Sequence, residues 1–280
     1  MELVGAISGR TTDFEDGGFR RQCREHHQAP GRTWRFYTLL SISVVSHFFD
    51  GNGKGLIRVM RLLALADLHG FREIYEWLVD VAAAEEPDAV VLAGDLLGWG
   101  GAFDTIEEAQ AADRVQVLRG LSRIDCPMLY VMGNDDFIEL DAPSPLLQSV
   151  HGKRIEIGDF NFMGYQYTLP FMGGIHERPE DEIAEDLAQL EAEIDSRTVL
   201  VTHGPVFGVL DRVRGGQHVG SMALRDFVER TAPRAHIHGH IHGEFGRDGR
   251  HFNVSSAGRK RAMVIDLESM EHHVLAVSAG

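Results

Sequence analysis

From residue 60 onward the amino-acid sequence predicts an α/β fold built on a largely buried sheet. Short apolar runs alternate with longer amphipathic stretches, which is typical of successive strand–helix units. The chain has 280 residues, of which 44% are hydrophobic and 25% charged. This composition is ordinary for a globular protein and excludes a low-complexity chain over most of the length. No apolar run reaches the roughly 20 residues that a membrane-spanning helix needs.

The predicted elements follow one another in a regular order. Five short apolar runs predict core strands, at residues 62–66, 89–93, 128–132, 198–202 and 234–238. Amphipathic stretches between them predict four helices, at residues 71–86, 105–124, 179–196 and 221–231. Two further pairs of strand-like segments predict a second sheet, 154–157 with 161–165 and 262–267 with 272–277.

The first 59 residues differ in composition from the rest of the chain. They carry 8 Lys and Arg against 6 Asp and Glu, whereas residues 60–280 carry 19 against 36. They are also rich in glycine and show no sustained helical or strand periodicity. Two interpretations stay open: residues 1–59 are a poorly ordered extension before a domain at residues 60–280, or translation starts at Met60.

Charge and cysteine content exclude several classes of protein. The formal net charge is −15, and residues 60–280 alone carry −17, which disfavours attraction to nucleic acid or to an anionic membrane. Cys23 and Cys126 are too few for a disulfide framework or a thiolate metal site. We therefore expect a cytoplasmic protein with no membrane partner. The sequence predicts no particular oligomeric state.

Residue types that bind metals follow every predicted core strand. In chain order they are Asp67, His69, Asp95, Asn134, His203, His240 and His242. Each alone is more simply a helix cap, a turn residue or a buried histidine. In open α/β sheets, however, ligands bind beyond the carboxyl ends of the strands, so these side chains are expected to converge. Five such coincidences in order favour one shared site.

The ordered blocks D-x-H, G-D, G-N-x-[DE], H and G-H-x-H resemble the calcineurin-like metallophosphoesterase family, from Met60 to the end of the chain. The resemblance implies a two-sheet β-sandwich flanked by helices, a four-layer α/β/β/α fold, with two metals at the edge of the sheets. It also implies that Asp95 bridges the metals. By the same resemblance, the remaining ligands would divide into one set of Asp67, His69 and His242 and another of Asn134, His203 and His240.

The ligand types agree with this resemblance on chemical grounds. Imidazole combined with carboxylate and amide oxygen suits manganese, iron or zinc. Two such ions, about 3.5–4 Å apart, can share a hydroxide nucleophile and stabilise the oxygens of an in-line phosphoryl displacement. The expected function is therefore dinuclear metal-dependent hydrolysis of a small phosphodiester or phosphomonoester. An alternative is a metal-binding scaffold of the same fold without catalysis. A DNA nuclease would need a basic groove, which the acidic composition disfavours.

The third block departs from the family at Asp135. The family usually has a histidine there, which the resemblance assigns to the substrate phosphate or to the leaving oxygen. An ionised Asp135 would repel an anionic ester, whereas a protonated one could donate a hydrogen bond. A third interpretation is that it only caps a helix. Asp135 is thus a candidate catalytic residue beside Asp95.

The segment 208–225 resembles the substrate wall of several subfamilies. His218 lies in its glycine-rich loop, ahead of a helix that Ser221 can cap, and such a loop can bind an anion. Arg214 could pair with phosphate or be solvated surface. His218 and Arg214 are the candidate substrate-binding residues. His236 and His238 alternate with His240 along one strand and are expected to be buried.

Overall fold

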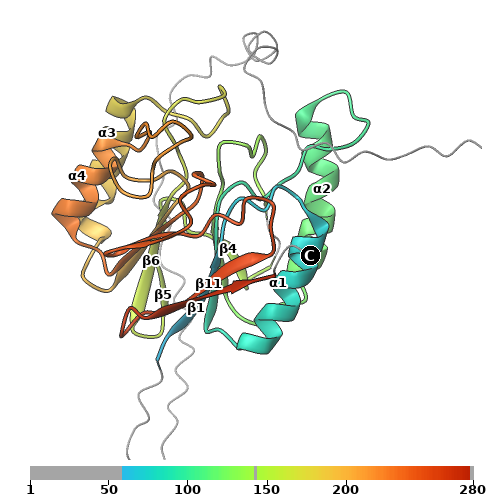
Figure 1. Cartoon of the computed structure of the whole chain (residues 1–280), viewed down its shortest axis with the longest axis horizontal. Coiled ribbons are helices and arrows are strands. Elements are labelled where there is room, and N and C mark those ends of the chain that lie inside the picture. Colours follow the sequence, from blue (N-terminus) through green and yellow to red (C-terminus); the bar gives the residue numbers. More distant parts are fainter. Residues whose placement is uncertain (1–58, 142–143, 278–280) are drawn as a thin grey trace, which may run out of the picture. The chain divides into compact units, whose positions relative to one another are not determined.

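The computed structural model describes residues 59–141 and 144–277. They form two mixed sheets of six strands each, flanked by four helices (Figure 1). The four-layer α/β/β/α arrangement expected from the resemblance is confirmed. Both interpretations of residues 1–59 concern a segment that lies, apart from residue 59, outside the described residues. None of the described helices is long and apolar enough to cross a membrane.

The first sheet has the strand order β12-β11-β1-β2-β3-β4. Its parallel strands are β1 (Arg61–Leu65), β2 (Ala89–Ala93), β3 (Met128–Val131) and β4 (Leu147–Ser149). Antiparallel β11 (Arg261–Asp266) and β12 (His272–Ala276) complete the other edge. The carboxyl ends of β1, β2 and β3 therefore lie side by side.

The second sheet has the strand order β5-β6-β7-β8-β10-β9. Four neighbours run parallel: β6 (Phe160–Tyr165), β7 (Thr198–Thr202), β8 (Ala235–His238) and β10 (His251–Asn253). The antiparallel strands β5 (Ile155–Ile157) and β9 (Gly246–Asp248) form its edges. Because β7 and β8 are neighbouring parallel strands, their carboxyl ends also lie side by side.

Alternating side chains along the strands divide the interior into three apolar layers. In β1, Leu62 and Ala64 join the core between the sheets, whereas Leu63 and Leu65 pack under the helices. α1 (Arg72–Glu85) and α2 (Ile106–Leu121) cover the first sheet. α3 (Glu180–Leu190) and α4 (Met222–Thr231) cover the second, as Figure 1 shows. Because successive side chains of a strand point to opposite faces, each sheet packs against the other sheet on one face and against helices on the other.

Two sequence expectations about individual elements are wrong, and three short strands were missed. The two additional strand pairs do not form a second sheet, because one pair joins β7 and β8 while the other joins β1. The third helix ends at Leu190 instead of residue 196, and a 3-10 turn over Glu191–Glu193 follows it. The strands β4, β9 and β10 were not anticipated, since each has only three residues and carries no clear alternation.

Candidate metal centre

The residues that follow the core strands converge from both sheets. His203 comes directly after β7 of the second sheet, and its Nε2 lies 3.2 Å from Oδ2 of Asp95, which follows β2 of the first. The backbone N–H of His240 donates to the carboxylate of Asp67 at 3.1 and 3.2 Å. The carboxyl edges of the two sheets therefore meet, and the expected convergence is what the structure shows.

Three of these residues form a group that we call the open triad: Asp67, His69 and His242. Their ligand atoms all lie within 4.8 Å of one another. Nε2 of His242 is 3.3 Å from Oδ1 of Asp67 and 3.5 Å from Nε2 of His69. The side chain of His242 is 50% exposed, whereas that of Asp67 is buried. Solvent therefore reaches this group through His242.

A second group, the buried triad, consists of Asp95, His203 and His240, whose ligand atoms also lie within 4.8 Å of one another. Asn134 joins it, since its Oδ1 lies 3.1 Å from Nε2 of His203. Nδ1 of His203 lies 2.8 Å from the carbonyl of Ala93. Because a carbonyl only accepts, Nδ1 donates its proton to it, which leaves Nε2 as the ring nitrogen that faces the group.

Asp95 belongs to both sides of the centre. It groups with His203 and His240 in the buried triad. It also forms a further cluster with His69 of the open triad and Asp135, whose ligand atoms likewise lie within 4.8 Å of one another. Its Oδ1 accepts a hydrogen bond from the backbone N–H of Asp135 at 2.9 Å. This position, facing residues of both triads, is the one that a bridging carboxylate requires.

The backbone at the centre adopts a conformation that non-glycine residues rarely take. Asp67, His69, Asp95 and His240 have φ of 55°, 46°, 52° and 67°, all in the left-handed region. Such residues persist only where the surrounding structure holds them, and they concentrate at functional sites. Local backbone strain therefore accompanies the orientation of these four side chains.

Three glycines of the sequence blocks permit the close approach of these groups. A Cβ on Gly94 would lie 2.3 Å from the ring of His203, and one on Gly133 would lie 2.1 Å from Oδ1 of Asp95. A Cβ on Gly239 would lie 2.6 Å from Oδ2 of Asp67. Gly94 also has a φ of 91°, which suits a sharp turn after a strand, whereas Gly133 is not in the left-handed region. Its role is clearance for Asp95 instead of a turn.

Asp136 is a positioning residue that sequence reasoning missed. Its buried carboxylate accepts from the backbone N–H groups of Leu96, Leu97 and Gly133 at 2.8–3.2 Å. These amides belong to the segments that follow β2 and β3, so the carboxylate ties together the two turns that carry Asp95 and Asn134. The acidic fourth position of the third sequence block is the only signal of this role.

Asp135 faces the open triad. Its Oδ2 lies 3.4 Å from Nδ1 of His69, and its Oδ1 accepts from the amide Nδ2 of Asn134 at 3.2 Å. The interpretation of Asp135 as a helix cap is wrong, because no helix begins in the residues that directly follow it. Burial and the nearby charge of Asp95 raise the pKa of Asp135 to about 6.

The electrostatics of the centre favour a cation. Burial alone would lower the pKa of His203, but the facing carboxylate of Asp95 outweighs it and raises the pKa to about 10. Burial lowers the pKa of His240 to about 4, so this imidazole is neutral and able to ligate. Four imidazoles, two carboxylates and an amide oxygen within one cluster match the donors that manganese, iron and zinc take. The residues present therefore fit two divalent metals.

Comparison with known proteins decides the family. A family profile described as Calcineurin-like phosphoesterase matches residues 60–244, which is more than half of the chain. The chain belongs to the calcineurin-like phosphoesterase family. Members of this family use divalent metals. No protein of curated function matches the sequence.

Solved structures agree in fold. One of them covers 79% of this chain and 100% of its own, with a TM-score of 0.65 at 17% identity. The protein TT1561 of Thermus thermophilus covers 78% and 99%, with a TM-score of 0.59 at 16% identity. A dimetal phosphatase from Danio rerio covers 79% and 99%, with a TM-score of 0.51 at 13% identity. At these identities the likeness establishes the shared fold alone.

The expected substrate segment is ordered around a buried carboxylate. Asp211 lies 2.5 Å from Nδ1 of His218 and accepts from the backbone N–H groups of Gly208 and Gly220 at 2.9 and 3.0 Å. His218 remains 31% exposed at its side chain. Arg214 is exposed and makes no hydrogen bond or ion pair within residues 59–141 and 144–277.

The N-terminus of α4, by contrast, is already occupied by a carboxylate. Ser221 caps the helix by accepting from Leu224 N–H at 3.0 Å. Oε1 of Glu180 accepts from the N–H of Ala223 and from the hydroxyl of Ser221. The N–H groups of Ala223 and Leu224 in the first turn are therefore satisfied within the chain, and anion binding by the segment would depend on His218 and Arg214.

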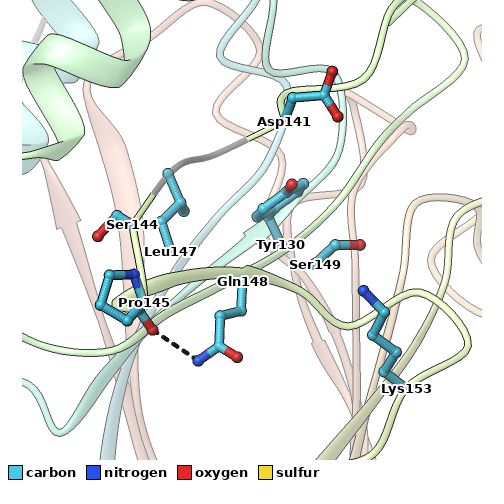
Figure 2. Close-up of a pocket in the computed structure, with 8 residues that line it drawn as sticks. All are labelled: Tyr130, Asp141, Ser144, Pro145, Leu147, Gln148, Ser149 and Lys153. Carbon is cyan, nitrogen blue, oxygen red and sulfur yellow. Dashed lines mark hydrogen bonds between the residues drawn. The ribbon is translucent and has the colours of Figure 1, made fainter. Parts of the chain in front are cut away.

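A hollow elsewhere on the molecule is separate from the metal centre. Figure 2 shows the eight residues that line it, with Gln148 donating to the carbonyl of Pro145: Tyr130, Asp141, Ser144, Pro145, Leu147, Gln148, Ser149 and Lys153. They lie on β3, on β4 and on the segments beside β4. None of the eight is a candidate ligand, so the hollow takes no part in the site. His236 and His238 are buried, as expected.

Proposed function

We propose that this protein is a dinuclear metal-dependent phosphoesterase that hydrolyses a small phosphodiester or phosphomonoester. One observation carries the proposal: two clusters of metal-ligand side chains face each other across Asp95. One metal would be held by Asp67, His69 and His242. The other would be held by Asn134, His203 and His240, with Asp95 between them.

The bound metals would supply an acidified water and positive charge for the phosphate oxygens. Other groups of the protein hold the metal ligands in place. The N–H of Asp135 fixes the carboxylate of Asp95, and the carbonyl of Ala93 fixes the tautomer of His203. A preorganised centre of this kind lowers the reorganisation that the transition state requires.

Asp135 is proposed as the catalytic group that replaces the usual histidine. Its carboxyl lies beside His69, and its raised pKa makes the protonated form, which can donate to an ester oxygen, more accessible near neutral pH. His218, oriented by Asp211, and Arg214 are proposed to contact the substrate from the 208–225 segment.

The charge of the chain supports a small substrate. Residues 60–280 carry a net charge of −17, which opposes a polyanion such as nucleic acid. A small ester meets only the local charge of the metal centre. We further propose manganese as one of the metals and a cytoplasmic location without membrane partners.

The experiment compares hydrolysis of bis(p-nitrophenyl) phosphate and p-nitrophenyl phosphate before chelation, after chelation and after addition of manganese, iron or zinc. The proposal predicts turnover of at least one ester that chelation abolishes and metal restores. The matched variant pair is Asp67→Asn at the centre and Asp80→Asn on the exposed face of α1. Only Asp67→Asn is expected to lose turnover.

A scaffold of the same fold is a second candidate, and the replacement of the family histidine by Asp135 is the observation that favours it. Bound metal without turnover of either ester would support the scaffold and overturn the enzyme. Turnover that survives complete removal of metal would contradict both.

A further inference from the structure

An exposed aromatic ring stands directly against the metal centre. Phe171 contacts His240 edge to face, with ring centroids 5.9 Å apart and an interplanar angle of 89°. Phe171 is 74% exposed, the highest exposure of any large hydrophobic residue among those the structure describes. A ring of this size normally lies in an apolar core. Here it stays in solvent beside a candidate ligand.

The loop that carries Phe171 is fixed in place by its own hydrogen bonds. The carboxylate of Glu177 accepts from the backbone N–H groups of Phe171, Met172 and Gly173 at 2.8, 2.7 and 2.8 Å. Bonds from Thr168 N–H to His176 O and from Arg178 N–H to Thr168 O close the base of the loop. Three amides on one carboxylate are a strong anchor for so short a segment.

The same loop is seated on the metal centre at two further points. Sδ of Met172 lies 3.7 Å from Nδ2 of Asn134. A Cβ on Gly174 would lie 2.6 Å from the carbonyl of Asn134, so glycine permits this approach. The exposure of Phe171 therefore does not come from a loop free in solvent. The chain places this ring at the rim of the site and leaves its surface open.

We propose that Phe171 is a specificity-determining residue on which an aromatic group of the phosphate ester stacks while the phosphate lies at the metal centre. This inference rests on the proposed function and narrows its substrate class to esters with a planar aromatic substituent, such as an aryl group or a nucleobase. Aromatic rings gain from stacking and from removal of apolar surface from water. Phe171 offers both, next to the group that would hold a metal.

The test measures binding of three phosphonates to the metal-loaded protein by calorimetry. Phenylphosphonate, cyclohexylphosphonate and methylphosphonate share the phosphonate group and differ only in the organic group. We expect phenylphosphonate to bind about tenfold more tightly than methylphosphonate, which corresponds to about 1.4 kcal/mol. Cyclohexylphosphonate should fall between them, because it has apolar surface but no π-face.

Two variants assign this preference to the ring. Phe171→Ala should abolish the preference for phenylphosphonate and leave methylphosphonate binding and metal content unchanged. The matched control is Phe103→Ala, which removes another exposed phenylalanine, 48% exposed on the loop after β2, and should keep the preference. Glu177→Gln, which weakens the anchor of the loop while keeping the ring, should reduce the preference partly.

The outcomes separate this proposal from the proposed function. Equal binding of phenyl- and methylphosphonate by the wild type, or a preference that survives Phe171→Ala, would overturn the stacking role. Loss of methylphosphonate binding or of metal in Phe171→Ala would also overturn it, because the ring would then only support His240. A preference that depends on Phe171 in a protein that hydrolyses no ester would leave the stacking role standing and overturn catalysis alone.

Discussion

The open and buried triads have similar ligand chemistry in different surroundings. Each combines one aspartate with two histidines within 4.8 Å. In the buried triad the side chains of His203 and Asp95 are 0% and 4% exposed, whereas His242 of the open triad is 50% exposed. Metal in the buried triad is therefore expected to exchange slowly, and metal in the open triad to exchange with solvent. We therefore expect substrate to enter from the open side.

The largest effect is expected at the residue that the two triads share. Asp95→Asn keeps the size of the side chain and removes its charge, so both metals should bind more weakly. Turnover should fall by at least about 100-fold, because substitutions of residues that only support the ligands already cost about 10- to 100-fold. Metal analysis and ester hydrolysis measure both losses. A variant with two metals and nearly full turnover would show that Asp95 does not bridge.

The second effect distinguishes one triad from the other. His203→Ala should lose the metal of the buried triad, and His242→Ala that of the open triad, each leaving about one equivalent. During dialysis against a chelator, wild-type protein should release one metal quickly and the other slowly. His242→Ala should lack the fast phase and His203→Ala the slow phase. His273→Ala, a histidine of the exposed edge strand β12, serves as the control.

If both metals of the wild type leave at one rate, the difference in exposure has no consequence for exchange. Loss of both metals in each histidine variant would show that the triads bind only as a unit. Either result would break the comparison between the open and buried sides.

A smaller and more selective effect is expected from Asp135, which faces the open triad. Asp135→His restores the residue usual in the family, an imidazole that can donate a proton to the leaving oxygen. General-acid assistance typically contributes about 10²–10⁴-fold, so alkyl leaving groups should react much faster while p-nitrophenolate changes little. Asp135→Asn removes the charge without adding an imidazole and separates the two effects. An equal change for both leaving groups, or a fall in both, would contradict the idea that Asp135 donates a proton less effectively than the histidine usual in the family.

The smallest effect is expected outside both triads, at His218. His218→Ala should raise KM by roughly two- to tenfold, the worth of one hydrogen bond, with metal content unchanged. His272→Ala, on the exposed strand β12, is the matched control. Steady-state kinetics with metal analysis measures the outcome. A loss of metal, or an unchanged KM, would exclude His218 from substrate contact.

Much of the fold and centre could be predicted because their signals are local. The apolar runs fixed β2 and β7 to the residue, and the polar residues after the strands marked the centre. The distribution of strands between the sheets could not be predicted, since pairing joins segments far apart in the sequence. Leu62, for example, lies opposite Ile265.

The less predictable parts of the centre depend on three-dimensional approach. The clearance that Gly133 gives Asp95 and the exposure of Phe171 follow from segments meeting in space, and no sequence period announces them. Phe171 lies on a loop without a recognisable motif. Its anchor, Glu177, is one acidic residue among many until the three amides that it accepts from are located.

The most direct test of the central claim is anomalous diffraction from crystals of the protein grown with manganese. The account predicts two anomalous peaks, one at the open triad and one at the buried triad, with the carboxylate of Asp95 between them. A single peak, or two peaks of which either lies away from Asp67 and His203, would contradict a dinuclear centre shared through Asp95.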